Sequence, residues 1–225
     1  MTRLSSKKVN EILDLLKAEY PEAGCALEHV NVFELLICVV LSAQTTDASV
    51  NRVSPDLFAK YPDAQALAGA SQSDVEEIIR TIGMYKTKSR NIISLAQALC
   101  EKHNGQVPEN YDALVALPGV GRKTANVVLA VGFGHQKIAV DTHVFRVSHR
   151  IGLATEETSG TSAKNAGEKN VVATEKELMK ILPEDRWTEA HHSLIWHGRN
   201  CCTARNPKCG SCPINKQCRK NGVYK

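Results

Sequence analysis

The chain has 225 residues, of which 43% are hydrophobic and 23% charged, and its formal net charge is +4. Glycine and proline contribute only 14 and 8 residues, which excludes a long low-complexity chain. The longest apolar run, residues 35–41, is far shorter than the roughly 20 residues that cross a bilayer. The N-terminus shows no apolar stretch behind its basic residues, so we expect a cytoplasmic protein.

The first half of the chain has the hydrophobic spacing of helices. Near the N-terminus an apolar face recurs every three to four residues, after a serine cap at Ser5 or Ser6 and before Pro21: Val9, Ile12, Leu13 and Leu16. Residues 33–41 are apolar on nearly every side, as expected of a helix buried in a bundle. The pair Ser54-Pro55 predicts the start of a new helix or a kink, because proline fits the first turn.

The later elements are predicted from caps and periodicity. Ser73 with Glu76, and Thr174 with Glu177, have the spacing of capping boxes, the first opening a helix that Gly83 ends. Residues 155–170 are polar without an apolar period and predict a surface loop. No run alternates with period two, so the fold class is all-α. Further helices are predicted over residues 88–102, 111–116, 122–131, 142–151 and 186–199.

Residues 199–225 carry seven lysines and arginines and no acidic residue. Such a segment indicates a polyanionic partner or a solvated surface. It also holds an array of cysteines that favours metal or cluster binding over disulfides: Cys202, Cys209, Cys212 and Cys218. Four thiolates suit either Zn²⁺ or a [4Fe–4S] cluster, and the spacing alone leaves both open. Cys201 stands next to the first of them and makes that ligand ambiguous.

The sequence Leu-Pro-Gly-Val-Gly at residues 117–121 predicts a tight turn between two helices. Gly119 and Gly121 permit positive φ, and the N–H groups at the start of the next helix would form an anion site that suits a DNA phosphate. The alternative is a plain turn between helices. Arg122, Lys123 and Thr124 follow directly and favour phosphate binding.

Lys123 stands near the positive end of its helix, which is a poor place for a merely structural lysine. An uncharged amine there is a nucleophile of the Schiff-base type, and a phosphate-contacting surface lysine is the alternative. Asp141 is predicted to cap the helix over residues 142–151. The segment 132–141 is long enough for the chain to return, so both side chains can face one pocket.

These motifs together resemble the helix-hairpin-helix DNA glycosylases, and specifically the endonuclease III branch. The resemblance is carried by LPGVGRKTANVVL, by AVDTHVFRVSHR and by the cysteine spacing, and it extends from about residue 5 to 218. Two departures are a longer segment at residues 155–170 and methionine at position 84, where a leucine is frequent.

The resemblance implies two helical domains flanking a DNA-binding cleft. Residues 25–137 would form a helical barrel with the hairpin, and residues 1–24 with 138–225 an iron–sulfur cluster domain. It also assigns the four cysteines to a [4Fe–4S] cluster, with Arg205 and Lys208 on its DNA-facing loop. Gln44 resembles the residue that fills the gap left by an extruded nucleotide, and Met84 the wedge that parts base pairs.

The implied activity is that of a bifunctional DNA glycosylase and abasic-site lyase. It would excise oxidised pyrimidines from duplex DNA through a Schiff base on Lys123, with Asp141 as proton acceptor or charge stabiliser, and cut 3′ to the lesion. We expect a monomer associated with the nucleoid. The alternatives are a non-catalytic iron–sulfur DNA-binding protein and a mismatch-specific monofunctional glycosylase, which lacks the lysine.

Overall fold

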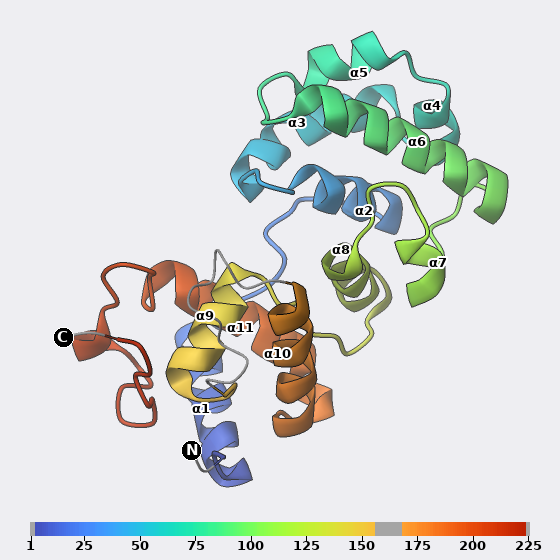
Figure 1. Ribbon diagram of the computed structural model, residues 1–225. Helices are drawn as coiled ribbons and strands as arrows, with labels where there is room; N and C mark the ends of the chain where they lie inside the picture. The colour runs from blue at the N-terminus through green and yellow to red at the C-terminus, as the bar shows by residue number, and fades with distance from the viewer. Residues whose placement is uncertain (1–2, 156–167, 224–225) are drawn as a thin grey trace. The chain divides into compact units, whose positions relative to one another are not determined.

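The computed structural model describes residues 3–155 and 168–223 (Figure 1). Within these residues every regular element is a helix, which confirms the all-α fold class. The chain divides into two compact units: residues 25–135 form one, and residues 1–24 with 136–225 form the other. Each unit has its own hydrophobic core. No helix in the described ranges is long and apolar enough to span a membrane.

The unit of residues 25–135 is built around α2 (Val32–Leu41). All residues from Leu35 to Leu41 are buried, because α3, α6, α8 and η1 all pack against this helix. Gly132 lets η1 approach α2 closely, since a Cβ there would lie 2.9 Å from Val32 Cγ1. The other elements are α3 (Asp47–Lys60), α4 (Ala64–Ala68), α5 (Gln72–Ile79), α6 (Tyr85–His103), α7 (Tyr111–Val115), α8 (Arg122–Val127) and its continuation as a turn of π-helix, η1 (Val128–Gly132).

The second unit packs α11 (Trp187–Asn200) against α1 (Ser6–Glu19) and α9 (Thr142–Ile151). The apolar face predicted for α1 is buried as expected, and Ser5 caps the helix by accepting from the Lys8 N–H. The bounds of α9 are those predicted. The remaining elements are α10 (Glu168–Ile181), η3 (Glu184–Arg186) and η4 (Cys209–Ser211).

Both predicted capping boxes are wrong. The cap of α5 is Ser71, whose hydroxyl accepts from the Asp74 N–H at 3.2 Å, and the helix ends at Ile79, four residues before Gly83. Thr174 lies buried inside α10, which begins at Glu168. Glu177 cannot close a box there, because its carboxylate accepts from the N–H and the hydroxyl of Thr155.

Some element boundaries also differ from those predicted from proline and from the polar segment at residues 155–170. Pro55 starts no helix but lies inside α3, because buried residues before and after it, Val53 and Leu57, hold the same helix face on the core. Helices α3 and α4 were not predicted as such. Of the predicted loop 155–170, residues 168–170 belong to α10, and residues 156–167 lie outside the described ranges.

Candidate functional site

The turn between α7 and α8 has the geometry that its glycines suggested. Gly119 has φ of +76°, and a Cβ there would meet Asn91 Cβ at 3.4 Å and Val40 Cγ1 at 3.5 Å. Gly121 caps α8 without a side chain, and a Cβ there would meet nothing within 4 Å. The first turn of α8 therefore has no side-chain cap, and the space beside Gly121 is open.

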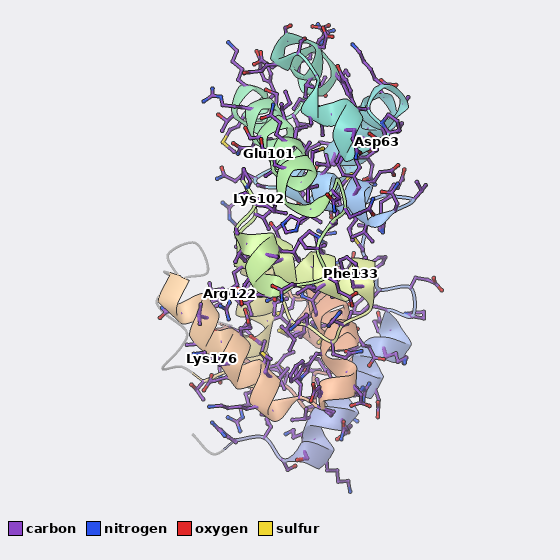
Figure 2. The ribbon with its side chains drawn as sticks, turned by 90° about the vertical axis from the view of Figure 1, so that its right-hand side faces the viewer. Asp63, Glu101, Lys102, Arg122, Phe133 and Lys176 are labelled. Atoms are coloured by element: carbon purple, nitrogen blue, oxygen red, sulfur yellow. The ribbon has the colours of Figure 1, made fainter. Side chains whose placement is uncertain are left out.

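The residues that follow the turn differ in exposure. Arg122, labelled in Figure 2, is half-buried. Its Nη1 lies 3.4 Å from the Tyr111 hydroxyl, and its guanidinium lies 5.9 Å from the centre of that ring. Lys123 is exposed, and Thr124 is half-buried. A stacked, hydrogen-bonded arginine is held in place, while the neighbouring lysine is accessible to a large substrate.

Asp141 belongs to the other unit and caps α9, as predicted. Its Oδ1 accepts from the N–H groups of His143 and Val144, both at 2.8 Å, and its Oδ2 lies 3.2 Å from His143 Nδ1. Only 14% of the Asp141 side chain is exposed. The carboxylate is therefore held rigidly at the positive end of a helix, where a negative charge is stabilised.

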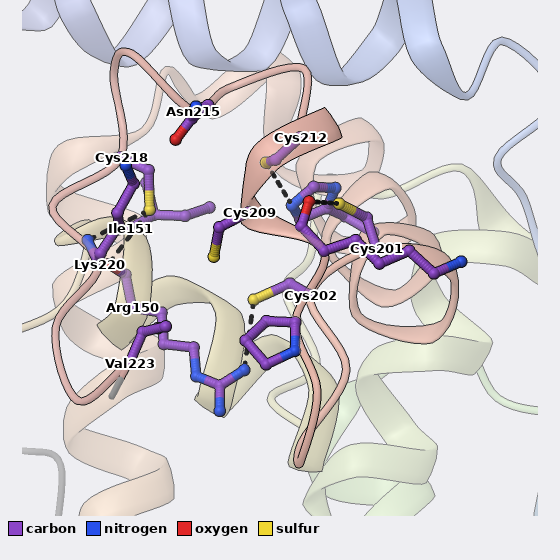
Figure 3. Close-up of a pocket in the computed structure, with 13 residues that line it drawn as sticks. Arg150, Ile151, Cys201, Cys202, Cys209, Cys212, Asn215, Cys218, Lys220 and Val223 are labelled. Atoms are coloured by element: carbon purple, nitrogen blue, oxygen red, sulfur yellow. Dashed lines mark hydrogen bonds between the residues drawn. The ribbon is translucent and has the colours of Figure 1, made fainter. Parts of the chain in front are cut away.

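The four predicted ligand cysteines line one pocket. Figure 3 shows Cys202, Cys209, Cys212 and Cys218 with their sulfurs directed into it, and none of the eight cysteines forms a disulfide. The Lys220 N–H donates to Cys218 Sγ at 3.3 Å. Four free thiols, an N–H donor to sulfur and a basic rim fit a cluster that carries negative charge.

Two arginines of α9 anchor the first part of this cysteine loop. Arg146 donates to the carbonyls of Cys202 and Gly198 at 3.1 and 2.9 Å. Arg150 donates to the carbonyls of Thr203 and Ala204 at 2.7 and 2.8 Å, and its Nη1 lies 3.5 Å from Cys202 Sγ. The helix that Asp141 caps is therefore also hydrogen-bonded to the cysteine loop.

Cys201 and His197 lie beside the four cysteines. Their ligand atoms and Cys212 Sγ are all within 4.8 Å of one another, so a metal could reach them. The Cys201 thiol donates to the Lys208 carbonyl at 3.7 Å (Figure 3). Burial lowers the pKa of His197 to about 4. Its Nδ1 lies 3.1 Å from the Tyr20 hydroxyl, and its Nε2 lies 3.6 Å from Cys212 Sγ.

The two residues assigned to DNA insertion share an unusual backbone. Gln44 has φ of +54° and Met84 has φ of +56°, and both side chains are exposed. A left-handed conformation is costly for residues other than glycine, and among such residues in the described part of the chain only Asn104 and Lys220 share it with them. Met84 is 50% exposed, which is a large apolar area to leave in water.

Sequence reasoning missed several residues around these sites. Arg146 and Arg150 are four residues apart on α9, a spacing that places both on one helix face and could have drawn attention. Lys88 is buried on α6, where it occupies a position of the apolar period.

Comparison with known proteins identifies the class. Residues 37–173 match the model of the HhH-GPD superfamily of base excision DNA repair proteins, and residues 202–218 match the iron–sulfur binding domain of endonuclease III. The chain is 46% identical to the endonuclease III of Haemophilus influenzae over 96% of each chain. It is 43% identical to that of Bacillus subtilis over 96% of this chain and 94% of the relative.

Solved structures of endonuclease III and of a related glycosylase are similar to this chain in fold. A trapped covalent intermediate of an endonuclease III with DNA superposes with a TM-score of 0.86 at 46% identity, covering 96% of this chain and 97% of that one. A thermostable thymine-DNA glycosylase shares the fold, with a TM-score of 0.81 at 23% identity over 95% of this chain and 96% of that one.

The helical fold, the glycine turn and the cysteine array define a helix-hairpin-helix DNA glycosylase of base excision repair with abasic-site lyase activity. Within that class, the chain belongs to the endonuclease III family. Its cofactor is the [4Fe–4S] cluster of that family. The predicted family, enzyme class and cofactor are confirmed, and zinc is set aside.

Proposed function

We propose that this enzyme excises oxidised pyrimidines from duplex DNA with Lys123 as its nucleophile. The observation that carries the proposal is the exposed Lys123 at the second position of α8, directly after the glycine turn. A lysine nucleophile must reach C1′ of an extruded deoxyribose, so it must be accessible and close to the strand.

In this mechanism the uncharged Lys123 Nζ bonds to C1′, and the bond from C1′ to the base breaks with the electron pair leaving on the base. Opening of the sugar ring gives a Schiff base. Loss of a 2′ proton then expels the 3′ phosphate oxygen, which cuts the strand by β-elimination. Asp141 accepts the lysine proton or stabilises the cationic sugar; its rigid hold by two backbone N–H groups suits either role.

We assign DNA contacts to both units. In the first unit, the N–H groups after Gly119 and Gly121, with Arg122 and Thr124, would hold a phosphate. Gln44 would fill the space of the extruded nucleotide, and Met84 would part the adjacent base pairs. In the second unit, Arg205 and Lys208 are exposed and would contact the backbone.

We assign the cluster to the four cysteines that line the pocket, Cys202, Cys209, Cys212 and Cys218. The matched iron–sulfur segment begins at Cys202 and ends at Cys218, which favours Cys202 over its neighbour Cys201 as the first ligand. When bound, the cluster would tie the loop around Arg205 and Lys208 into a fixed shape. We infer that the protein acts as a monomer associated with the nucleoid.

Borohydride trapping tests the nucleophile, because borohydride reduces a Schiff base to a stable amine. We expect wild-type protein to be trapped on duplex DNA with thymine glycol or an abasic site, and Lys123→Gln to lose trapping while it still binds DNA. Lys102→Gln, which changes an exposed lysine of α6, is the control (Figure 2). Trapping of Lys123→Gln at the wild-type rate would contradict the assignment. Base release without trapping would indicate a monofunctional glycosylase, and binding alone a non-catalytic DNA-binding protein.

A further inference from the structure

Lys88 is a buried cation on α6. It is 4% exposed and lies on the helix face formed by Ile92, Leu95 and Leu99, all of them fully buried. Its Nζ donates to Thr45 Oγ1, and within the described residues it forms no ion pair. Burying an ammonium group with one neutral partner costs free energy, so this lysine is a poor choice for stability alone.

The hydrogen bond of Lys88 joins two of the left-handed turns of this unit, those of Gln44 and Met84. Thr45 directly follows Gln44, the first left-handed residue. Met84, the second, accepts the Lys88 backbone N–H on its carbonyl at 3.0 Å. Lys88 therefore contacts one turn through its backbone and the other through its side chain. Met84 also begins α6 without a side-chain cap, and its carbonyl accepts the Thr87 N–H as well, at 3.0 Å.

We propose that Lys88 is a positioning residue, which holds the turns of Gln44 and Met84 in register so that both side chains enter the duplex together. This inference rests on the proposed function, in which these two residues replace the stacking lost on extrusion. Without the Lys88 contact, each turn would have to be ordered separately during insertion. The conformational entropy lost in ordering them would weaken DNA binding.

The test compares two abasic-site substrates, a duplex and a single strand, because only the duplex requires parting of base pairs. Lys88→Met keeps a long apolar side chain in the core but removes the donor, and Thr45→Val removes the acceptor. We expect each variant to cut the duplex about tenfold more slowly in single-turnover assays, which corresponds to about 1.4 kcal/mol. We expect both to cut the single strand at the wild-type rate. Lys102→Met, at an exposed position of the same helix, is the matched control.

A double variant separates positioning from general damage. If both residues act through one contact, Lys88→Met with Thr45→Val should be no slower than the slower single variant. Equal losses on duplex and single strand, or losses that multiply in the double variant, would overturn the inference. Should Lys88→Met fail to fold, Thr45→Val on the two substrates decides the question alone. An inactive wild-type protein on both substrates would overturn the proposed function and this inference with it.

Discussion

Asp141 combines a structural and a chemical role in one carboxylate, and the two can be separated. Asparagine caps helices about as well as aspartate, so Asp141→Asn should keep the hydrogen bonds to the N–H groups of His143 and Val144. We expect little loss of thermal stability but a fall of about 10²-fold or more in the single-turnover lyase rate, because a proton acceptor is removed.

Asp141→Ala provides the comparison, since alanine cannot cap. It should lose both the rate and about 0.5–2 kcal/mol of stability, measured by thermal unfolding. If Asp141→Asn cut abasic-site DNA as fast as the wild-type protein, the residue would be a helix cap and nothing more.

Lys88 should also have a measurable effect on stability. Burial lowers the pKa of Lys88 below its usual value. The folded state therefore carries an unfavourable charge at neutral pH, and it releases the proton before the unfolded state does as the pH rises. We expect Lys88→Met to unfold at higher urea concentration than the wild-type protein at pH 7. That advantage should shrink as the pH rises from the lowered pKa towards about 10.4, the unfolded value.

This unfolding should be followed by circular dichroism and not by tryptophan fluorescence. Both tryptophans, Trp187 and Trp196, lie in the other unit and do not report on α6. An advantage of Lys88→Met that did not change with pH would mean that the ammonium carries no penalty. If Lys88 lowers the stability of the fold and speeds cutting of duplex DNA alone, its burial is explained by its role in DNA binding.

At the scale of elements, α9 connects the proposed proton acceptor with the cysteine loop. Arg150 makes three contacts with that loop, to two carbonyls and to Cys202 Sγ. Arg150→Met would keep the length of the side chain but leave these acceptors without their donor. We expect the variant to lose the visible absorbance of its cluster about tenfold faster in the presence of an iron chelator, because the loop opens more often.

Lys176→Met is a suitable control for this measurement, since Lys176 is an exposed residue of α10 in the same unit (Figure 2). A cluster lifetime that is equal in Arg150→Met and in the wild-type protein would show that the cysteines alone hold the loop.

The elements that the sequence predicts well are those with a local signal at both ends. Helix α9 has a capping aspartate before it and Gly152, with φ of +92°, after it, and its predicted bounds are correct. The start of α6 was placed three residues late, because Met84 begins it in a left-handed conformation without a capping side chain. The spacing predicts one helix over residues 122–131 and does not distinguish the π-helical turn of η1, which packs against α2.

The same distinction applies to the sites. The glycine turn, the cap at Asp141 and the cysteine array are short segments whose chemistry is visible in their residues. The Lys88–Thr45 contact joins residues 43 positions apart, and the arginines of α9 bind carbonyls more than 50 positions away. No local pattern records such pairs, although a lysine within an apolar helical period was a signal that something must satisfy it.

For the molecule as a whole, the groups assigned to the reaction come from two units with separate cores. Lys123, Gln44 and Met84 belong to the first unit, whereas Asp141 and the cysteine loop belong to the second. The mechanism therefore requires both units to engage one DNA molecule, so phosphate contacts in either unit contribute to the same binding constant.

The positive charge of the chain is concentrated in residues 199–225, which predicts how binding depends on salt. Each phosphate contact adds about 0.9 to the slope of log K against log salt concentration, because it releases a counterion. We expect Arg205→Gln with Lys208→Gln to make this slope shallower by about 2 on an abasic-site duplex, measured by fluorescence anisotropy between about 50 and 200 mM salt. Lys102→Gln with Lys176→Gln removes the same charge from exposed helical positions and should leave the slope unchanged. Equal slopes for the two double variants would mean that the basic segment acts only through net charge. A shallower slope in Arg205→Gln with Lys208→Gln alone would mean that DNA phosphates bind beside the cysteine loop.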